Sequence, residues 1–474
     1  MSNPYKSPDA KQHDASLAAD TVFWGLLITQ FLGAFNDNYF KQMVLLKCTD
    51  LVSRNGPDLQ PWALGAFALP FVLLSGLGGY LSDRYSKRRI VVLCKVLEIV
   101  VMAAALQVLL ISSLSDATQL GLLIAVLAFM GAQSAIFGPS KYGILPELFT
   151  SRKLLPVNGA IQMTTFVAII FGMAGAGFAL DSLGNSLWLC STIAVGIAVL
   201  GTLTSFLVRP TPVADPHIKL KFDNLFIPKD VRKLFRSDSS LLKAILVMTL
   251  FWFIGGYAQP AINTLGENVL KLNKTRTSLM AASVGVGIAL GCVIAGFTSR
   301  GGSKDGGRWT TRGSWMIVGS LLLITLLGSG WLGRPAESAN TTQSLLTCLL
   351  SADTMEWALR FAMLSLGISA GVFVVPIQVF LQSKPPAEQK GRLIGAMNFM
   401  TWLGILGSAV YLGVFNAACA AISPPGQSLQ HQYLGFLTLA IFMLPVALFY
   451  RLPVAQAIDA DPNALQSERS HGDA

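Results

Sequence analysis

The residues most able to do chemistry are charged side chains inside long apolar runs. Asp37 lies about fifteen residues into the first such run, and Lys41 follows it by four residues. A charge inside a bilayer is costly unless it is paired or faces water, so it marks a candidate functional site. Asp37 and Lys41 would share one helix face, so they predict either a structural ion pair or, with Asn36 and Asn38, a polar cavity lining.

A second group of charges lies near the ends of other apolar runs. Lys141 stands in the stretch 137–148, where Gly and Pro interrupt the helix pattern. Its side chain either extends to the membrane surface or turns inward and attracts an anionic group. Lys95 and Glu98 are three residues apart in a third run. Glu98 is the deeper of the two and is a candidate cavity or coupling carboxylate.

Several kinds of chemistry have no support. The four histidines all fall in tails or loops, the six cysteines are far apart, and no P-loop or H-x-x-x-x-D acyltransferase signature occurs. We therefore expect no catalytic residue, no metal site and no cofactor. The net charge of +10 comes from short loops between apolar runs, which indicates contact with lipid head groups rather than nucleic acid.

The composition defines the elements that must position these charges. The 474 residues are 53% hydrophobic and 13% charged, against roughly 25% charged in soluble domains, and the mean hydropathy is +0.56. This excludes a soluble enzyme, a disordered chain and a disulfide scaffold. Twelve runs are long enough for membrane helices, at about 22–46, 61–81, 90–113, 119–138, 157–180, 187–208, 241–266, 278–299, 312–333, 356–382, 391–415 and 432–451.

Charges in the loops predict orientation and domains. Five alternate loops hold 21 Lys and Arg residues, and the other six hold 6. By the positive-inside rule both termini lie in the cytoplasm. We expect a cytoplasmic tail (1–21), a six-helix bundle (22–208), a cytoplasmic linker (209–240), a second bundle (241–453) and a tail (454–474). Within the linker, Val231, Leu234 and Phe235 predict either a short amphipathic helix on the membrane surface or a plain solvated segment.

An internal repeat relates the two bundles. Gly159-Ala160 and Gly395-Ala396 open similar stretches 236 residues apart, and Gly79 and Gly296 begin a weaker echo. Parallel six-helix repeats are the architecture of the major facilitator superfamily, with the substrate between the halves. The fold class predicted is thus an all-α membrane protein with twelve transmembrane helices in two six-helix pseudo-repeat bundles.

The loop 79–89 resembles the superfamily signature G-x-L-x-D-R-x-G-R-R. Gly79, Asp83, Arg84 and Arg88 occupy its positions, and Ser86 stands where Gly is usual. We expect Gly79 to let two helices approach closely and Asp83 to accept hydrogen bonds. The resemblance implies that this loop is a conformational latch and not a substrate site.

A more specific resemblance is to the bacterial lysophospholipid transporter family. It is carried by Asn36-Asp37, by the stretch 138–148, by Val157-Asn158-Gly159 and by the stretch 371–376, with Gln382 closing that helix. The resemblance implies inward flipping of lysophospholipid, chiefly lysophosphatidylethanolamine, across the bacterial cytoplasmic membrane for reacylation. It also implies that Asp37 and Lys141 handle the head group. Any acyltransferase or acyl-carrier-protein synthetase would be a separate partner.

Two positions depart from that family. Gln162 stands where family members have Glu, and Gln259 stands where they have Arg. Either the two charges were a pair and were lost together, or substrate preference differs here, so both residues stay candidate substrate contacts. The alternatives to a lysophospholipid transporter are an exporter of amphipathic drugs or another small molecule, a membrane-embedded acyltransferase, and a scaffold that docks a cytosolic acyltransferase.

Overall fold

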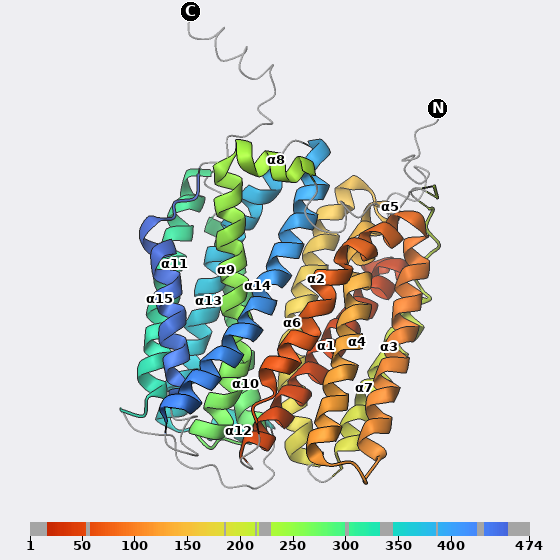
Figure 1. Cartoon of the computed structure of the whole chain (residues 1–474). Coiled ribbons are helices and arrows are strands. Elements are labelled where there is room, and N and C mark those ends of the chain that lie inside the picture. The colour runs from red at the N-terminus through yellow and green to blue at the C-terminus, as the bar shows by residue number, and fades with distance from the viewer. Residues whose placement is uncertain are drawn as a thin grey trace, which may run out of the picture.

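The computed structural model describes residues 17–53, 57–183, 186–213, 216–217, 229–298, 303–331, 345–384, 387–423 and 431–453. Within these residues the regular elements are helices, as the sequence predicts. An apolar segment in lipid can satisfy its backbone polar groups only within a helix or a closed barrel, which explains this choice. The helices stand in two bundles side by side (Figure 1). Residues 1–16 of the predicted tail 1–21, and all of the predicted tail 454–474, lie outside the described residues.

The N-terminal half contains six long helices and one short one. They are α1 (Thr21–Ser53), α2 (Gln60–Arg84), α3 (Lys87–Leu110), α4 (Asp116–Gly143), the short α5 (Leu145–Leu148), α6 (Ser151–Leu183) and α7 (Leu187–Ser205). The central core of this half is formed around the buried side chains of Tyr39, Phe40 and Met130. Helix α1 is therefore central to its bundle and brings its polar residues into the interior.

The C-terminal half follows the same order. It contains α9 (Ser239–Thr264), which continues as a π-helix, η4 (Leu265–Val269), then α10 (Lys274–Thr298), α11 (Ser303–Gly328), the short α12 (Leu345–Leu350), α13 (Thr354–Ser383), α14 (Ala387–Ile422) and α15 (Tyr433–Phe449). Its core surrounds Tyr257, Phe373 and Phe436.

The connection between the halves contains one short helix, α8 (Lys229–Ser237). Val231 on α8 is fully buried, and Leu234 and Phe235 pack against the core of the C-terminal half. Arg232 and Arg236 are exposed on the opposite face. The helix predicted as one alternative is present, but its apolar face covers the C-terminal bundle.

Ten of the described helices are long and apolar enough to cross a membrane. Helix α15 is slightly shorter, with 17 residues. Helix α1, with 33 residues, is long enough to cross, but Gln30, Asn36, Asp37 and Asn38 dilute its apolar character. Together these helices correspond to the twelve predicted runs.

The end of the molecule that carries α8 also carries the loop between α2 and α3, and we call it the basic end. Arg88 donates hydrogen bonds to the carbonyl oxygens of Val208 (2.6 Å) and Phe206 (3.3 Å), just after α7. Lys87 forms an ion pair with Glu147. These contacts tie α3 to the ends of α5 and α7, so the basic loop stabilises its own half.

The most extensive contacts between the halves are made by two helix pairs, α2 with α14 and α6 with α10. The ring of Phe71 stacks on Trp402 with centroids 3.6 Å apart. On the other pair, Ile170 packs against Gly285. In Figure 1 these four helices occupy the middle of the molecule, between the outer helices of each bundle.

Polar contacts between the halves concentrate at the opposite end, which we call the junction end. Asp181 of α6 accepts hydrogen bonds from the backbone N–H groups of Lys274 (3.3 Å) and Thr275 (2.7 Å), and so caps α10 of the other half. The Lys274 ammonium pairs with Asp50 of α1 at 2.7 Å. Further cross-half contacts are Thr49 with Glu267, Gln60 with Thr264, and Asn416 with Asp58.

Candidate substrate-binding site

Asp37 occupies a polar position between α1 and α4. Its Oδ2 accepts a hydrogen bond of 2.8 Å from the hydroxyl of Ser134. The Lys41 ammonium lies 5.3 Å from the centroid of the Phe67 ring. Among the described residues no ion pair joins Asp37 to Lys41. Of the two sequence alternatives for Asp37 and Lys41, the structural ion pair is therefore not formed in this conformation.

Lys141 lies on the same face of α4 as Ser134, because seven residues are two helical turns. The rise of a helix places it about 10 Å farther toward the basic end. Its side chain is 8% exposed, and its ammonium lies 4.9 Å from the Tyr142 ring centroid. It is within electrostatic range of Asp37, but in the described part of the chain it has no carboxylate at ion-pair distance.

Glu98 has a different setting. Its Oε1 accepts a hydrogen bond of 2.8 Å from the Asn36 amide, and its Oε2 pairs with the Lys95 ammonium at 2.5 Å. All three side chains are at most 2% exposed. Gly33 makes room for the pair, since a Cβ there would collide with the Lys95 Nζ. In this conformation Asn36 and Glu98 thus hold α1 against α3.

The remaining polar candidate on α1 points back to its own helix. The Asn38 amide donates a hydrogen bond of 2.8 Å to the carbonyl oxygen of Ala34. Asn38 is partly buried and also lines the contact with Gly172 on α6. The three consecutive polar residues 36–38 thus face three different neighbours, and Asp37 alone among them carries a charge.

Gln162 and Gln259 lie in different parts of the molecule. Gln162 is exposed, and its Oε1 accepts a hydrogen bond of 3.3 Å from the Tyr142 hydroxyl. The Gln259 amide donates to Gln42 of α1 at 2.9 Å and contacts the Sδ of Met173 at 3.5 Å. Met173 and Gln162 are both on α6, separated by about 16 Å along its axis. The two glutamines are not a contact pair in this conformation.

The structure corrects one expectation about the predicted latch loop, residues 79–89. A Cβ on Gly79 would meet nothing within 4 Å, whereas a Cβ on Gly78 would lie 2.9 Å from the carbonyl oxygen of Ala135. The prediction that Gly79 permits close helix packing is therefore wrong for this conformation, and Gly78 makes that contact with α4. Asp83 is exposed, and the Arg84 guanidinium lies 5.9 Å from the Tyr80 ring centroid.

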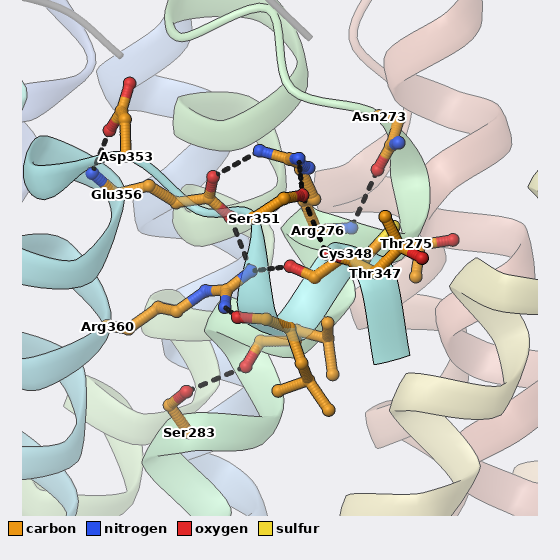
Figure 2. A network of polar contacts seen from close by, with 12 residues as sticks. Asn273, Thr275, Arg276, Ser283, Thr347, Cys348, Ser351, Asp353, Glu356 and Arg360 are labelled. Carbon is orange, nitrogen blue, oxygen red and sulfur yellow. Dashed lines mark hydrogen bonds and ion pairs between the residues drawn. The ribbon is translucent and has the colours of Figure 1, made fainter. Parts of the chain in front are cut away.

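The structure also contains a charge cluster that was not predicted from the sequence (Figure 2). Glu356 at the start of α13 pairs with Arg276 of α10 at 2.7 Å and with Arg360 at 2.5 Å. The guanidinium of Arg276 also donates to the Ser351 hydroxyl at 2.8 Å, and that of Arg360 donates to the Cys348 carbonyl at 3.0 Å. The spacing Glu356-x-x-x-Arg360 could have indicated half of this cluster.

Comparisons with known proteins identify the class. The sequence model described as Major Facilitator Superfamily matches residues 20–409. The chain belongs to the Major Facilitator Superfamily. It is therefore a multi-pass membrane transporter and not an enzyme, as the sequence predicts. This confirms both the two-bundle fold class and the resemblance to a transporter family.

Its similar relatives include proteins named lysophospholipid transporter. One, from Salmonella arizonae, is 26% identical over 417 residues, covering 82% of this chain and 88% of the relative. Another, from Pectobacterium carotovorum, is 24% identical and covers 82% of this chain and 86% of the relative. These matches confirm the family resemblance seen in the motifs.

Solved structures with the same fold include transporters of other solutes. A point mutant of the nucleoside transporter NupG has a TM-score of 0.65, with 12% identity over 90% of this chain and 98% of that one. A D-xylose-proton symporter has a TM-score of 0.63, with 15% identity over 92% and 99%. At this level of identity the likeness establishes the fold alone.

Proposed function

We propose that this transporter moves a lysophospholipid, with lysophosphatidylethanolamine as the leading candidate, from the outer to the inner leaflet of the bacterial cytoplasmic membrane. The two halves would rock about the region between them, and Asp37 and Lys141 would bind the head group. The names of the relatives support the substrate class. The geometry around Asp37 supports the site.

The observation that carries the proposal is a pair of opposite charges that have no ionic partner among the described residues. Asp37 has a hydroxyl as its hydrogen-bond donor, and Lys141 has an aromatic ring as its neighbour. A charge kept inside a membrane without a partner is expensive, so these two are available for a ligand. A zwitterionic head group supplies the complement: an ammonium for Asp37 and a phosphate for Lys141.

The charge balance favours an anionic component in the ligand. Lys95 and Glu98 neutralise one another. The other named charges in this region are Asp37, Lys41 and Lys141, which leave one positive charge in excess. A zwitterionic head group brings a phosphate to this region and leaves its net charge unchanged, whereas a purely cationic drug would add a further positive charge. The drug-exporter alternative therefore fits this region less well.

The orientation follows from the positive-inside rule, applied to the basic end. This end carries the loop 84–89 and α8, and we propose that it faces the cytoplasm. Both termini would then be cytoplasmic. A lysophospholipid delivered to the inner leaflet would be consumed by a separate acyltransferase, and that reaction would maintain the gradient without an ion.

The test is uptake of labelled lysophosphatidylethanolamine by cells that lack their own lysophospholipid transporter. Wild type, Asp37→Asn and Lys141→Ala are compared at equal membrane expression, after an outer-leaflet wash. We expect wild type to accumulate label and both variants to lose most of it. Lys243→Ala is the matched control, because Lys243 is exposed and in the other half, and it should transport like wild type.

Head-group analogues sharpen the experiment. A lysolipid that retains phosphate but lacks the ammonium should be affected by Lys141→Ala and hardly by Asp37→Asn, because only the lysine would contact it. Well-expressed wild type that accumulates no lysolipid would refute this substrate. Efflux of an amphipathic cation by the same protein would then favour the exporter.

A further inference from the structure

Two lysines lie on opposite sides of Asp37 along the length of the N-terminal bundle. Helix α1 runs toward the junction end, so Lys41, four residues after Asp37, is about 6 Å nearer that end. Helix α4 runs the other way, so Lys141, seven residues after Ser134, is about 10 Å nearer the basic end. The hydrogen bond from Ser134 to Asp37 puts the two helices in register. The order toward the basic end is therefore Lys41, Asp37 and Lys141.

The three charged side chains also lie on facing sides of the two helices. Asp37 and Lys41 share a face of α1, since they are four residues apart. Ser134 and Lys141 share a face of α4, since they are two turns apart. Each lysine is within electrostatic range of Asp37. One carboxylate is thus flanked by an ammonium on either side.

Both lysines lie over aromatic rings. The Lys41 ammonium is 5.3 Å from the Phe67 ring centroid, and the Lys141 ammonium is 4.9 Å from that of Tyr142. Among the described residues neither ammonium has a carboxylate at ion-pair distance. A contact between a cation and a ring is weaker than a hydrogen bond between two charged groups. Each lysine can therefore leave its ring for a phosphate.

The two rings keep the lysines at different levels. Gly131 of α4 packs on Phe67, because a Cβ there would collide with the Phe67 carbonyl oxygen. Tyr142 is eleven residues farther along α4, which is about 16 Å toward the basic end. In an ethanolamine head group two carbons and an oxygen join the ammonium to the phosphate, a distance of about 5 Å by ordinary bond lengths. A head group whose ammonium is on Asp37 can therefore bring its phosphate to one lysine at a time.

We propose that Lys41 and Lys141 are two successive phosphate sites, and that the phosphate passes from one to the other while the ammonium stays on Asp37. The inference rests on the proposed function, because it takes the substrate to be a zwitterionic lysophospholipid. It explains why this region has one positive charge in excess. Two lysines serve a single phosphate, so one ammonium is always without an anion.

The present conformation indicates which lysine serves which side. Gln42, the residue after Lys41, is fully buried and donates hydrogen bonds to Asn263 (2.9 Å) and Ser278 (3.2 Å) of the other half. This contact separates Lys41 from the junction end. Lys141, in contrast, lies over the Tyr142 ring, and Tyr142 is 44% exposed. Lys41 is thus the site for a phosphate that arrives from the junction end, and Lys141 is the site from which it leaves.

Transport measured from each side tests the proposal. Right-side-out and everted membrane vesicles present opposite ends of the protein to added lysophosphatidylethanolamine. Lys41→Met removes the charge and keeps the length of the side chain. We expect its KM to rise about tenfold or more from the junction end, the value of one hydrogen bond between charged groups, and to stay unchanged from the basic end. Lys141→Met should show the reverse, with a lower maximal rate from the junction end.

Three controls separate this effect from a loss of structure. Lys41→Arg keeps the charge and should transport like wild type. Lys47→Met is the matched control, because Lys47 is also a partly buried lysine of α1 and contacts Gln119 of its own half at 3.5 Å. It should leave both KM values unchanged. A monoacyl lipid with an ammonium but no phosphate should give the same KM with wild type and Lys41→Met.

The possible failures are distinguishable. Wild-type vesicles that carry lysolipid, together with a Lys41→Met KM that is unchanged from the junction end or raised equally from both ends, would overturn the two phosphate sites alone. Wild-type vesicles that carry no lysolipid from either end would refute the proposed function, and this inference with it.

Discussion

The two halves have the same order of helices but keep their buried charges in different places. In α1, Asn36-Asp37-Asn38 stand between Phe35 and Tyr39, whereas in α9 the corresponding residues between Phe253 and Tyr257 are Ile254-Gly255-Gly256. The buried charges of the C-terminal half are at the junction end, around Glu356 (Figure 2).

This difference separates two uses of buried charge. Glu356 is 0% exposed and is held by two arginines, so it joins α10 to α13. Within the part of the chain that the structure describes, Asp37 and Lys141 have no such ionic partners. Two halves related by a sequence repeat can thus differ in role. In the C-terminal half the buried charges stabilise helix packing, whereas in the N-terminal half we propose that they bind substrate.

The largest effect should come from removing the centre of the C-terminal cluster. Glu356→Ala leaves two buried guanidinium groups without their carboxylate, which should lower the free energy of unfolding by about 5 kcal/mol. Thermal unfolding of the purified protein in detergent measures it. Glu356→Gln keeps a hydrogen-bond acceptor, so its free energy of unfolding should fall by less. An unchanged melting temperature in Glu356→Ala would show that the cluster does not stabilise this half.

The Lys95–Glu98 pair should contribute to folding stability, as the C-terminal cluster does, and should not bind substrate, as we propose for Asp37. Glu98→Gln leaves a buried ammonium and should cost about 3 kcal/mol of stability, whereas Lys95→Met with Glu98→Leu should cost roughly 1 kcal/mol, because no charge is left behind. The same unfolding assay compares them. If the double variant is stable but does not transport, Glu98 contacts the substrate and is not only a structural charge.

The junction end should respond more weakly, because its charges are partly exposed. Asp181→Asn weakens the cap that α6 provides to α10, at roughly 1 kcal/mol. The population with an open junction end should then rise about fivefold, measured as faster maleimide labelling of Ser278→Cys. Asp116→Asn, at the first turn of α4 within one half, is the control. Equal labelling of both variants would contradict a gating role for Asp181.

The smallest effect concerns the start of α9, outside the membrane. Burial raises the pKa of Asp238, but hydrogen bonds from Lys384 and Ser240 outweigh it and lower the pKa from 3.8 to about 2. A carboxyl with a depressed pKa contributes stability above pH 3.8 and loses it as pH falls toward 2. Asp238→Asn should therefore be less stable by about 1 kcal/mol at pH 7.

The pH dependence provides the check on that prediction. Wild type and Asp238→Asn are unfolded thermally between pH 7 and pH 2, and their melting temperatures should converge below pH 3.8. A difference that stays constant over the whole range would mean that the charge of Asp238 contributes nothing. The backbone N–H of Ser240 also donates a hydrogen bond of 2.9 Å to this side chain. That hydrogen bond, and not the charge, would then account for the stability that the cap contributes.

The helices could be predicted from the sequence because lipid permits so few alternatives for an apolar run. Asp37, Lys141 and Glu98 were identified as unusual for the same reason. The partner of Asp37 could not be predicted, because the Ser134 hydroxyl that donates to it is 97 residues away in the chain, which is beyond the reach of any local pattern.

Two other features depended on three-dimensional packing. Arg276 and Glu356 are 80 residues apart, so their contact was invisible to a search for local spacing. The choice between Gly78 and Gly79 depends on a rotation of one residue, about 100° on a helix, which is finer than a motif can specify.

The polar stretch of α1 also affects how the protein enters the membrane. This helix emerges from the ribosome before α4, yet an aspartate near its centre adds about 3 kcal/mol to the free energy of insertion. Ser134, which donates a hydrogen bond to Asp37, arrives about a hundred residues later. Helix α4 thus stabilises α1 in the membrane, and a nascent chain halted before α4 should release α1 from the bilayer more readily than the completed half does.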